Sequence, residues 1–307
     1  MKGLVMKSTG SWYSVLTDDQ QVYPSRLRGK FKIKGLKVTN PVAVGDRVEL
    51  EKEDEAENTA VITDILPREN YIIRKSTRKA YHGHILAANL DQAILIVTLN
   101  FPRTSLGFID RFLVSAESFR IPALLVFNKT DLLDDDQQEL QAAIMDLYER
   151  VGYSCVATSA ANTDDMAQLS NHLDRKVSLF SGHSGVGKST ILNQIHSDID
   201  QKTSEVSTFA NKGVHTTTYA EMFQISEKTF VIDTPGIKEL GLMDINEGEL
   251  RDYFPEMRAL IGECKFYNCT HVHEPGCAVR DLVEANEISE SRYYNYLSML
   301  QDEDSHR

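Results

Sequence analysis

The glycine-rich run that ends in Lys188 and Ser189 is the stretch whose residue types and spacing most clearly suggest chemistry. Glycines allow backbone N–H groups to wrap around phosphates, and a helix N-terminus adds favourable partial charge. The G-x-x-x-x-G-K-S pattern predicts that Lys188 binds the β- and γ-phosphates of a nucleotide and that the Ser189 hydroxyl ligates Mg²⁺. A glycine-rich turn without a ligand is the alternative interpretation. The predicted phosphate-binding residues are Gly182, His183, Ser184, Gly185, Val186, Gly187, Lys188, Ser189 and Thr190.

A D-x-x-G motif runs from Asp233 to Gly236 and follows an expected strand. Asp233 is expected to hold Mg²⁺, and the Gly236 N–H is expected to donate a hydrogen bond to the γ-phosphate. A threonine between the two motifs can complete the Mg²⁺ shell, and we favour Thr217 over Thr216. Such a segment can become ordered with GTP and loosen after hydrolysis.

The residue that orients the hydrolytic water is not obvious from these motifs. Ile237 stands where Ras-like enzymes place a glutamine for this purpose. His215, in the segment between the motifs, is therefore the first candidate, and Lys188 is expected to assist catalysis from the phosphate loop. We expect slow intrinsic turnover that rises when a partner orders the segment around His215.

An N-K-x-D motif predicts which base the nucleotide carries. The Asp131 carboxylate can accept hydrogen bonds from the guanine N1–H and amino group, which adenine does not offer in this arrangement. Lys129 is expected to lay its stem over the base, and Asn128 to tie neighbouring loops together. A T-S-A sequence that begins at Thr158 is expected to supply backbone N–H groups to guanine O6. The predicted base-binding residues are Asn128, Lys129, Thr130, Asp131, Ser159 and Ala160.

The order of these motifs is unusual for a nucleotide site. The base-reading motif at residues 128–131 precedes the phosphate loop at residues 182–189, whereas an ordinary GTPase has the phosphate loop first. The sequence therefore predicts a circularly permuted P-loop GTPase domain that binds GTP or GDP with Mg²⁺.

A second cluster of chemically capable residues lies near the C-terminus. Cys264, Cys269, His271 and Cys277 supply three thiolates and an imidazole, a Cys₃His set suited to tetrahedral Zn²⁺. Since these ligands leave no obvious catalytic position, one structural zinc ion is expected; His273 is the alternative nitrogen ligand. Cys155 lies far away in sequence and is expected in the core.

Composition limits the class of protein. The chain has 41% apolar and 25% charged residues and a net charge of −12, as expected for a globular protein. No apolar run approaches the roughly 20 residues that span a bilayer. The first residues do not resemble a secretory signal. Cysteines grouped for metal binding favour a reducing compartment, so we expect a cytoplasmic protein with no membrane association.

The charge distribution suggests one nucleic-acid surface despite the acidic total. Five basic residues alternate with apolar ones in the segment 26–34, so a strand would present them on one face. Contact with a phosphate backbone is favoured over a merely solvated face. A second basic stretch spans residues 68–84. The basic set is Arg26, Arg28, Lys30, Lys32 and Lys34.

The pattern of elements predicts three domains, at residues 1–67, 68–240 and 241–307. Short strands at residues 3–7, 11–16, 21–23, 29–33, 46–51 and 60–65 indicate an all-β barrel of the oligonucleotide-binding (OB) type. Strands at 93–97, 123–127, 177–180 and 229–232, with helices at 109–119, 137–149 and 190–196, indicate an α/β sheet. Helices at 248–254 and 280–300 flank the cysteine cluster in a mainly helical third domain.

These features together resemble the RsgA family of circularly permuted, small-ribosomal-subunit-dependent GTPases over nearly the whole chain. The resemblance implies an RNA-binding OB-fold barrel, a permuted GTPase domain and a C-terminal zinc domain. It also implies a role in late maturation of the small ribosomal subunit in the bacterial cytoplasm. That subunit would stimulate GTP hydrolysis, and the flanking domains would contact rRNA. Val214 departs from the basic residue of many relatives, which would alter the switch segment's contact with rRNA.

Two other functions fit the same residues. One is a non-ribosomal regulatory GTPase whose barrel binds protein or mRNA. The other is a nucleic-acid-binding protein that keeps its nucleotide site only for structure. In each case we expect a monomer.

Overall fold

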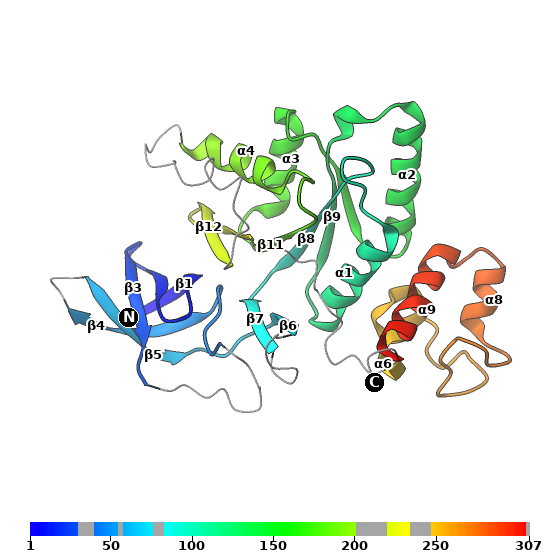
Figure 1. The fold of residues 1–307 in the computed structure, drawn as a ribbon, viewed down its shortest axis with the longest axis horizontal. Coiled ribbons are helices and arrows are strands. Elements are labelled where there is room, and N and C mark those ends of the chain that lie inside the picture. Colours follow the sequence, from blue (N-terminus) through cyan, green and yellow to red (C-terminus); the bar gives the residue numbers. More distant parts are fainter. Residues whose placement is uncertain (30–39, 55–57, 76–82, 201–219, 234–246, 305–307) are drawn as a thin grey trace.

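A computed structural model of the protein describes residues 1–29, 40–54, 58–75, 83–200, 220–233 and 247–304. Along the described chain, a β-barrel is followed by a sheet with helices and then by a group of short helices (Figure 1). Some residues singled out by sequence lie outside these ranges, namely Lys30, Lys32, Lys34, Val214, His215, Thr216, Thr217, Gly236 and Ile237.

The N-terminal strands close into a barrel, which confirms the predicted architecture. The strands are β1 (Lys2–Ser8), β2 (Tyr13–Thr17), β3 (Val22–Leu27), β4 (Arg47–Asp54) and β5 (Thr59–Ile65). Pairings run β1–β2–β3–β5–β4, and β4 pairs again with β1, which closes the sheet on itself. Alternate residues such as Val5, Val15 and Ile62 fill the interior, as the two-residue period of a strand requires.

The basic face predicted on the third strand is partly neutralised. Arg26 is exposed on β3 as the alternation predicted, but its Nε lies 2.9 Å from Glu53 Oε2, and Arg28 pairs with Glu51. Both acids belong to β4, so no local pattern around residue 26 could show them. Arg26 and Arg28 are therefore paired with acids, while the predicted contact of this face with a phosphate backbone stays a prediction.

A short antiparallel pair, β6 (Tyr71–Lys75) and β7 (Gly83–Ala88), connects the barrel to the next part of the chain. The turn at Gly45 packs so tightly on this pair that a Cβ atom at Gly45 would lie 2.1 Å from Ala88 O. Arg68, from the second basic stretch, is partly buried and binds Asp46 with Nε 2.6 Å from Oδ1. Arg68 therefore holds the barrel loop in place rather than facing a partner.

The central sheet is built on parallel strands, as predicted for an α/β domain. Its strands are β8 (Gln92–Val97), β9 (Ala123–Phe127), β10 (Ser154–Ala157), β11 (Val177–Ser181), β12 (Glu221–Ser226) and β13 (Thr229–Asp233). The spatial order is β10-β9-β8-β11-β13-β12, and all neighbours are parallel except β12 and β13. β11 thus lies between β8 and β13 although β9 and β10 separate it from β8 in sequence.

Helices cover both faces of this sheet (Figure 1). They are α1 (Leu106–Ser118), α2 (Asp135–Arg150), α3 (Thr163–Leu173) and α4 (Lys188–Asp200). Leu95 and Leu125 face α1 and α2, whereas Ile94 and Leu124 face α3 and α4. Burial on both faces explains why these strands are continuously apolar rather than alternating. The Asp134 side chain caps α2 in a capping box with Gln137.

The barrel and the central sheet share hydrogen-bonded strands. Edge strand β12 pairs antiparallel with β1 at Glu221 and Lys7, so the described strands of both parts form one 11-stranded sheet. The Lys7 ammonium lies 2.9 Å from the Glu221 carboxylate at this junction.

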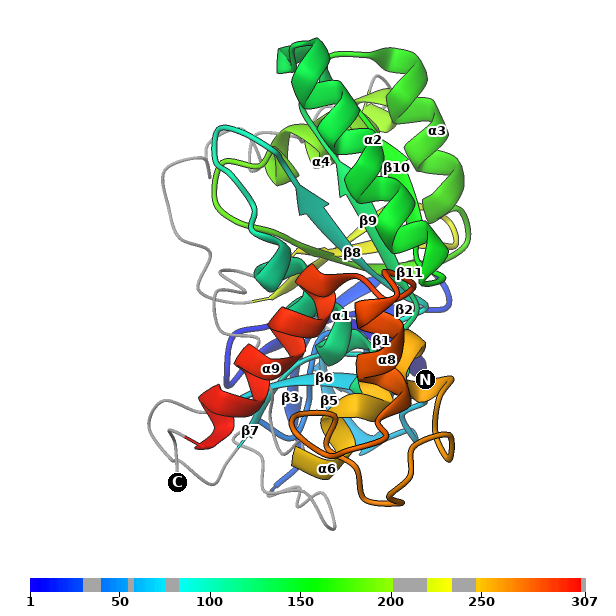
Figure 2. The ribbon, with the colours of Figure 1, turned by 90° about the vertical axis from the view of Figure 1, so that its right-hand side faces the viewer.

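The described C-terminal part consists of one long helix, α9 (Glu290–Asp304), and several short ones: α6 (Glu247–Leu250), η3 (Arg251–Tyr253), α7 (Pro255–Arg258) and α8 (Ala278–Glu284). The single helix predicted at residues 280–300 is wrong, because the chain turns between α8 and α9. Asn286 is left-handed at φ 59°, and Leu282 O accepts the N–H groups of Glu287 and Ile288. α9 packs against α1 of the central part (Figure 2).

Candidate functional site

The predicted nucleotide motifs follow strands whose carboxyl ends meet at one edge of the sheet. Phe180 of β11 is level with Asp233 of β13, and Phe127 of β9 is level with Val97 and with Ala157 of β10. The residues that follow β9, β10 and β11 therefore lie together, and ligands of open α/β sheets bind at this edge.

The phosphate loop has a backbone that requires glycine. Gly182, Gly185 and Gly187 have φ values of 144°, 87° and 101°. A Cβ atom at Gly182 would lie 2.4 Å from Ile96 O. The loop ends at Lys188, the first residue of α4, so N–H groups of the first helical turn are available to an anion. This is the strand–loop–helix context that the motif requires.

Lys188 ends the phosphate loop, and its side chain reaches back to the start of the same loop. Its Nζ donates hydrogen bonds to Gly182 O at 2.6 Å and to His183 O at 2.8 Å. Burial lowers the pKa of Lys188, and the nearby Asp233 carboxylate opposes this shift. Asp233 thus lies close enough to act on the same charge. Ser189 and Thr190 are exposed in the first turn of α4.

Asn128 joins the base-reading and phosphate-binding segments. It is 3% exposed, and its Nδ2 donates to Val186 O at 2.8 Å. Its Oδ1 accepts from the Thr158 hydroxyl at 3.3 Å. A Cβ atom at Gly187 would lie 2.3 Å from Asn128 Nδ2. Segments that are 58 residues apart in sequence are thereby held in direct contact.

An open cleft of about 640 Å³ lies beside the base-reading motif. Asp131 is exposed in the short helix η1 (Thr130–Leu132) at this cleft. Lys129 has a left-handed backbone at φ 66°, and its Nζ donates to Phe101 O at 2.6 Å. The cleft is lined by Thr130, Asp131, Gln138, Gln141, Ala157, Ser159, Ala161, Asn162 and Asp165.

Among the lining residues that were not predicted from the sequence, four have polar side chains: Gln138, Gln141, Asn162 and Asp165. The two glutamines lie on α2, and no sequence motif marks them. Asn162 caps α3 by accepting from the N–H groups of Asp164 and Asp165. An Asn-x-x-Asp spacing is typical of a helix start, so its place shortly after the T-S-A sequence could have indicated a helix that begins at the cleft.

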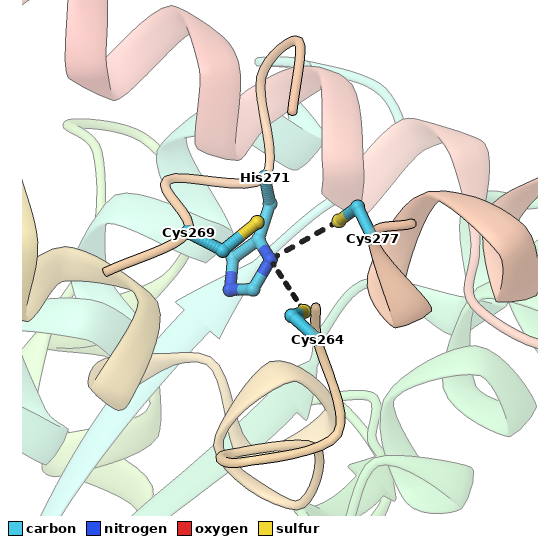
Figure 3. A group of neighbouring side chains, drawn as sticks. All are labelled: Cys264, Cys269, His271 and Cys277. Carbon is cyan, nitrogen blue, oxygen red and sulfur yellow. Dashed lines mark hydrogen bonds between the residues drawn. The ribbon is translucent and has the colours of Figure 1, made fainter. Parts of the chain in front are cut away.

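The predicted metal ligands converge in the C-terminal part (Figure 3). Ligand atoms of Cys264, Cys269, His271 and Cys277 all lie within 4.8 Å of one another. His271 Nδ1 is 3.6 Å from Cys264 Sγ and 3.3 Å from Cys277 Sγ. Three sulfurs and a nitrogen at these separations fit a tetrahedral metal ion. His273 is exposed and does not belong to the group.

The loop that carries these ligands is fixed by its own hydrogen bonds. Glu274 accepts from the Thr270 hydroxyl and from the N–H groups of Thr270, Val272 and His273, and these bonds outweigh burial and lower the pKa of Glu274 to about 2. Without a metal ion, burial raises the pKa of Cys269 to about 12. The cluster therefore favours neutral thiols until a cation replaces the protons.

Cys155 lies apart from this cluster, as the sequence predicted. It is partly buried, with Sγ 3.8 Å from Met145 O, and burial raises the pKa of its thiol to about 12. A protonated thiol of this kind packs rather than reacts. In the part of the chain that the structure describes, no helix is long and apolar enough to cross a bilayer.

Two family models match the chain. The RsgA GTPase model matches residues 65–243, and the RsgA N-terminal domain model matches residues 2–62. The first covers more than half of the sequence and includes the permuted order of motifs.

Named relatives match over nearly their full length. The small ribosomal subunit biogenesis GTPase RsgA of Cytophaga hutchinsonii is 52% identical over 307 residues, which is 100% of both chains. The small ribosomal subunit biogenesis GTPase RsgA 2 of Bacteroides thetaiotaomicron is 52% identical over 304 residues, 99% of this chain and 97% of its own.

Solved structures agree with these matches. YjeQ from Thermotoga maritima is 34% identical, with a TM-score of 0.77 over 98% of this chain and 97% of its own. YloQ, described as a circularly permuted GTPase, is 28% identical, with a TM-score of 0.76 over 100% of this chain and 96% of its own. The order of strands and motifs, the matching family models and these relatives lead to one conclusion: the chain belongs to the RsgA family of circularly permuted GTPases.

Proposed function

We propose that this GTPase acts in the biogenesis of the small ribosomal subunit, with GTP bound between the base-reading segment and the phosphate loop. The observation that carries the nucleotide site is the Asn128 side chain, which bonds Val186 O in one segment and the Thr158 hydroxyl beside the other. The biological role rests on the printed names of relatives that match over 97–100% of their length.

The phosphate end of the site is assigned as follows. Lys188 exchanges its two loop carbonyls for β- and γ-phosphate oxygens, and backbone N–H groups of residues 182–190 hold the phosphates. Ser189, Asp233 and Thr217 would hold Mg²⁺, and a bound Mg²⁺ would neutralise charge that develops on the phosphates. The Gly236 N–H contacts the γ-phosphate. His215 orients the attacking water, because Ile237 cannot.

The base end distinguishes guanine from adenine. Asp131 accepts from the guanine N1–H and amino group, and the stem of Lys129 covers one face of the ring. Among the described residues, no acceptor faces the Ala160 N–H, whereas the Ser159 N–H already bonds Asp165. We therefore assign the contact with guanine O6 to Ala160, with Ser159 shaping the loop.

The flanking parts are assigned to rRNA contact and metal binding. We propose domains at residues 1–67, 68–240 and 241–307, close to the family-model limits at residues 62, 65 and 243. The Cys₃His cluster would hold one structural Zn²⁺. Because Arg26 and Arg28 are paired with acids, contact of the barrel with phosphate would fall mainly on Lys30, Lys32 and Lys34. A cytoplasmic location and a monomeric state complete the proposal.

GTP turnover measured with purified ribosomal subunits tests this function. We expect the rate to rise with small subunits and not with an equal concentration of large subunits. Equal rates with both, or none with either, would remove the ribosomal role.

Two variants test the site itself. Lys188→Ala is expected to lose nucleotide binding. Asp131→Asn is expected to lower GTP affinity by at least about 100-fold, because a matched hydrogen-bonding edge is lost, and to favour xanthine nucleotides instead. An unchanged base preference in Asp131→Asn would contradict the guanine assignment.

A further inference from the structure

In the loop between β10 and α3, residues 158–162, almost every backbone N–H group donates to an acceptor in the loop itself, in β9 or in α3. Thr158 N–H donates to Phe127 O, and Asn162 N–H donates to Ser159 O at 2.9 Å. Ala161 N–H donates to the Ser159 hydroxyl at 3.3 Å. Within the described structure, Ala160 alone in this loop has an N–H group without an acceptor. The loop thus offers one defined donor to a ligand.

Asp165 fixes the residue directly before that donor. Its Oδ2 accepts from Ser159 N–H at 2.7 Å, and its own N–H is held by the Asn162 side chain at the start of α3. Ser159 is 4% exposed, so this bond lies at the buried base of the loop. A carboxylate that accepts from a backbone N–H sets the plane of the neighbouring peptides, because each peptide unit is rigid.

We propose that Asp165 is a positioning residue for guanine recognition, which holds Ser159 so that the Ala160 N–H points at guanine O6. This inference rests on the proposed guanine site. It goes further by assigning selectivity for the 6-oxo group to a side chain outside the N-K-x-D motif. A purely structural role is the alternative, because a carboxylate in the first turn of α3 also stabilises that helix through its dipole.

The two roles differ in which ligands they affect. 6-Thio-GDP keeps the N1–H and amino group that Asp131 reads but replaces O6 with sulfur, a weak acceptor. If Asp165 directs the O6 donor, Asp165→Ala lowers affinity for GDP about tenfold, the value of one good hydrogen bond. Affinity for 6-thio-GDP then stays within about twofold, and the preference of the wild type for GDP is largely lost. Isothermal titration calorimetry with both ligands measures these constants.

Two further variants provide controls. Asp164→Ala removes the same charge from the preceding residue of the same helix turn, and its side chain has no hydrogen bond within the described structure. It should leave the ratio of GDP to 6-thio-GDP affinity unchanged. Asp165→Asn keeps an oxygen that can accept from Ser159 N–H and should restore most of the GDP affinity.

The outcomes separate this inference from the proposed function. Equal loss of both ligands in Asp165→Ala, or the same ratio change in Asp164→Ala, would overturn the positioning role. If the wild type binds ADP as tightly as GDP, the guanine site itself fails. A melting temperature for Asp165→Ala close to that of Asp164→Ala shows that the fold is retained when the comparison is made.

Discussion

Close packing at single residues holds the two halves of the nucleotide site together. Gly187 and Asn128 illustrate this, since the side chain of one occupies the space where the other would carry a Cβ atom. Asn128 can reach Val186 O only because Gly187 leaves that space empty. Gly187 therefore makes room for the Asn128 side chain, in addition to the role that the motif gives it in phosphate binding.

Substitution of Gly187 by alanine tests this packing. The new Cβ atom would lie 2.3 Å from Asn128 Nδ2 in a backbone at φ 101°, so both the contact and the conformation are disfavoured. We expect GDP affinity to fall by at least about tenfold, equal to roughly 1.4 kcal/mol. Calorimetric titration with GDP measures the loss.

Gly152→Ala is the matched control for backbone strain. Gly152 has a similar φ of 105°, but a Cβ atom there would meet nothing within 4 Å. It should cost about 1–2 kcal/mol of stability and leave GDP affinity unchanged. If both alanine variants weaken GDP binding equally, the argument from Asn128 is wrong.

At the scale of elements, the loop with the Cys₃His cluster has little regular structure, so its fold would depend on the proposed zinc ion. Two of its cysteines, Cys269 and Cys277, belong to the core of the C-terminal part. Removal of a structural zinc ion costs binding energy of about 10–16 kcal/mol, which a small helical unit cannot replace. Loss of the zinc ion should therefore unfold the C-terminal part and leave the rest of the molecule folded.

We expect a strong chelator, or Cys269→Ser, to unfold the C-terminal helices while nucleotide binding is retained. Limited proteolysis followed by mass spectrometry should show early cleavage in residues 260–300. GDP titration on the same sample provides the control. Nucleotide binding lost in parallel with the helices would show that the two parts are not separable in this way.

Docking of α9 on α1 depends on Arg292, which is 1% exposed. Its Nη1 lies 2.6 Å from Asp110 of α1, and its Nε lies 2.6 Å from Glu256. Arg292→Leu would leave two carboxylates without their cation, so we expect a loss of about 3–5 kcal/mol in the free energy of unfolding. Urea denaturation followed by circular dichroism measures it, with the exposed Arg150→Leu as a near-neutral control.

The pH dependence of that variant gives a second check. Burial raises the pKa of Asp110, and the positive charge of Arg292 opposes this rise. Replacement of Arg292 by leucine should therefore raise the pKa of Asp110 further. The folded variant then binds the Asp110 proton more tightly than the unfolded chain does. The stability loss should therefore be smaller at about pH 5 than at about pH 8. A loss that does not vary with pH would indicate that lost packing, and not the carboxylate, causes it.

Local patterns predicted the elements well where the relevant partners are close in sequence. The first and last residues of the strand at 123–127 were predicted correctly, because a buried parallel strand is a continuous apolar run. The break at Asn286 was missed, because apolar residues continue at helical spacing on either side of it. Glu51 and Glu53 were missed as partners of Arg28 and Arg26, since only the folded barrel brings β3 and β4 together.

The same limit applies to the site. Asp131 was identified as a candidate because the contact proposed for it with a base would be made by its own side chain, and such side chains are marked by a sequence motif. Asp165 acts through the backbone of Ser159, and a backbone contact leaves little trace in residue types. Residues that position others therefore needed the structure.

Across the whole molecule, the barrel lies against the edge of the central sheet, where β1 pairs with β12. β12 follows residues 201–219 directly in the chain, and its first residue, Glu221, is the one that pairs with the barrel strand β1. The segment predicted to sense the γ-phosphate therefore leads straight into the barrel junction. The pairing of β1 with β12 makes the described strands of both parts one continuous sheet.

The Lys7–Glu221 ion pair at this junction should couple the stability of the two parts. Its side chains are 38% and 21% exposed, so solvent screens the pair and we expect a coupling energy of only about 0.5–1 kcal/mol. A double-mutant cycle of Lys7→Ala and Glu221→Ala isolates this energy from other contacts of either residue.

Trp12, the single tryptophan, lies in the barrel and reports its unfolding in urea. The coupling should shrink in about 1 M salt, where the screening length is about 3 Å. Additive effects of the two substitutions at low salt would mean that the backbone pairing of β1 with β12 holds the junction without help from these charges.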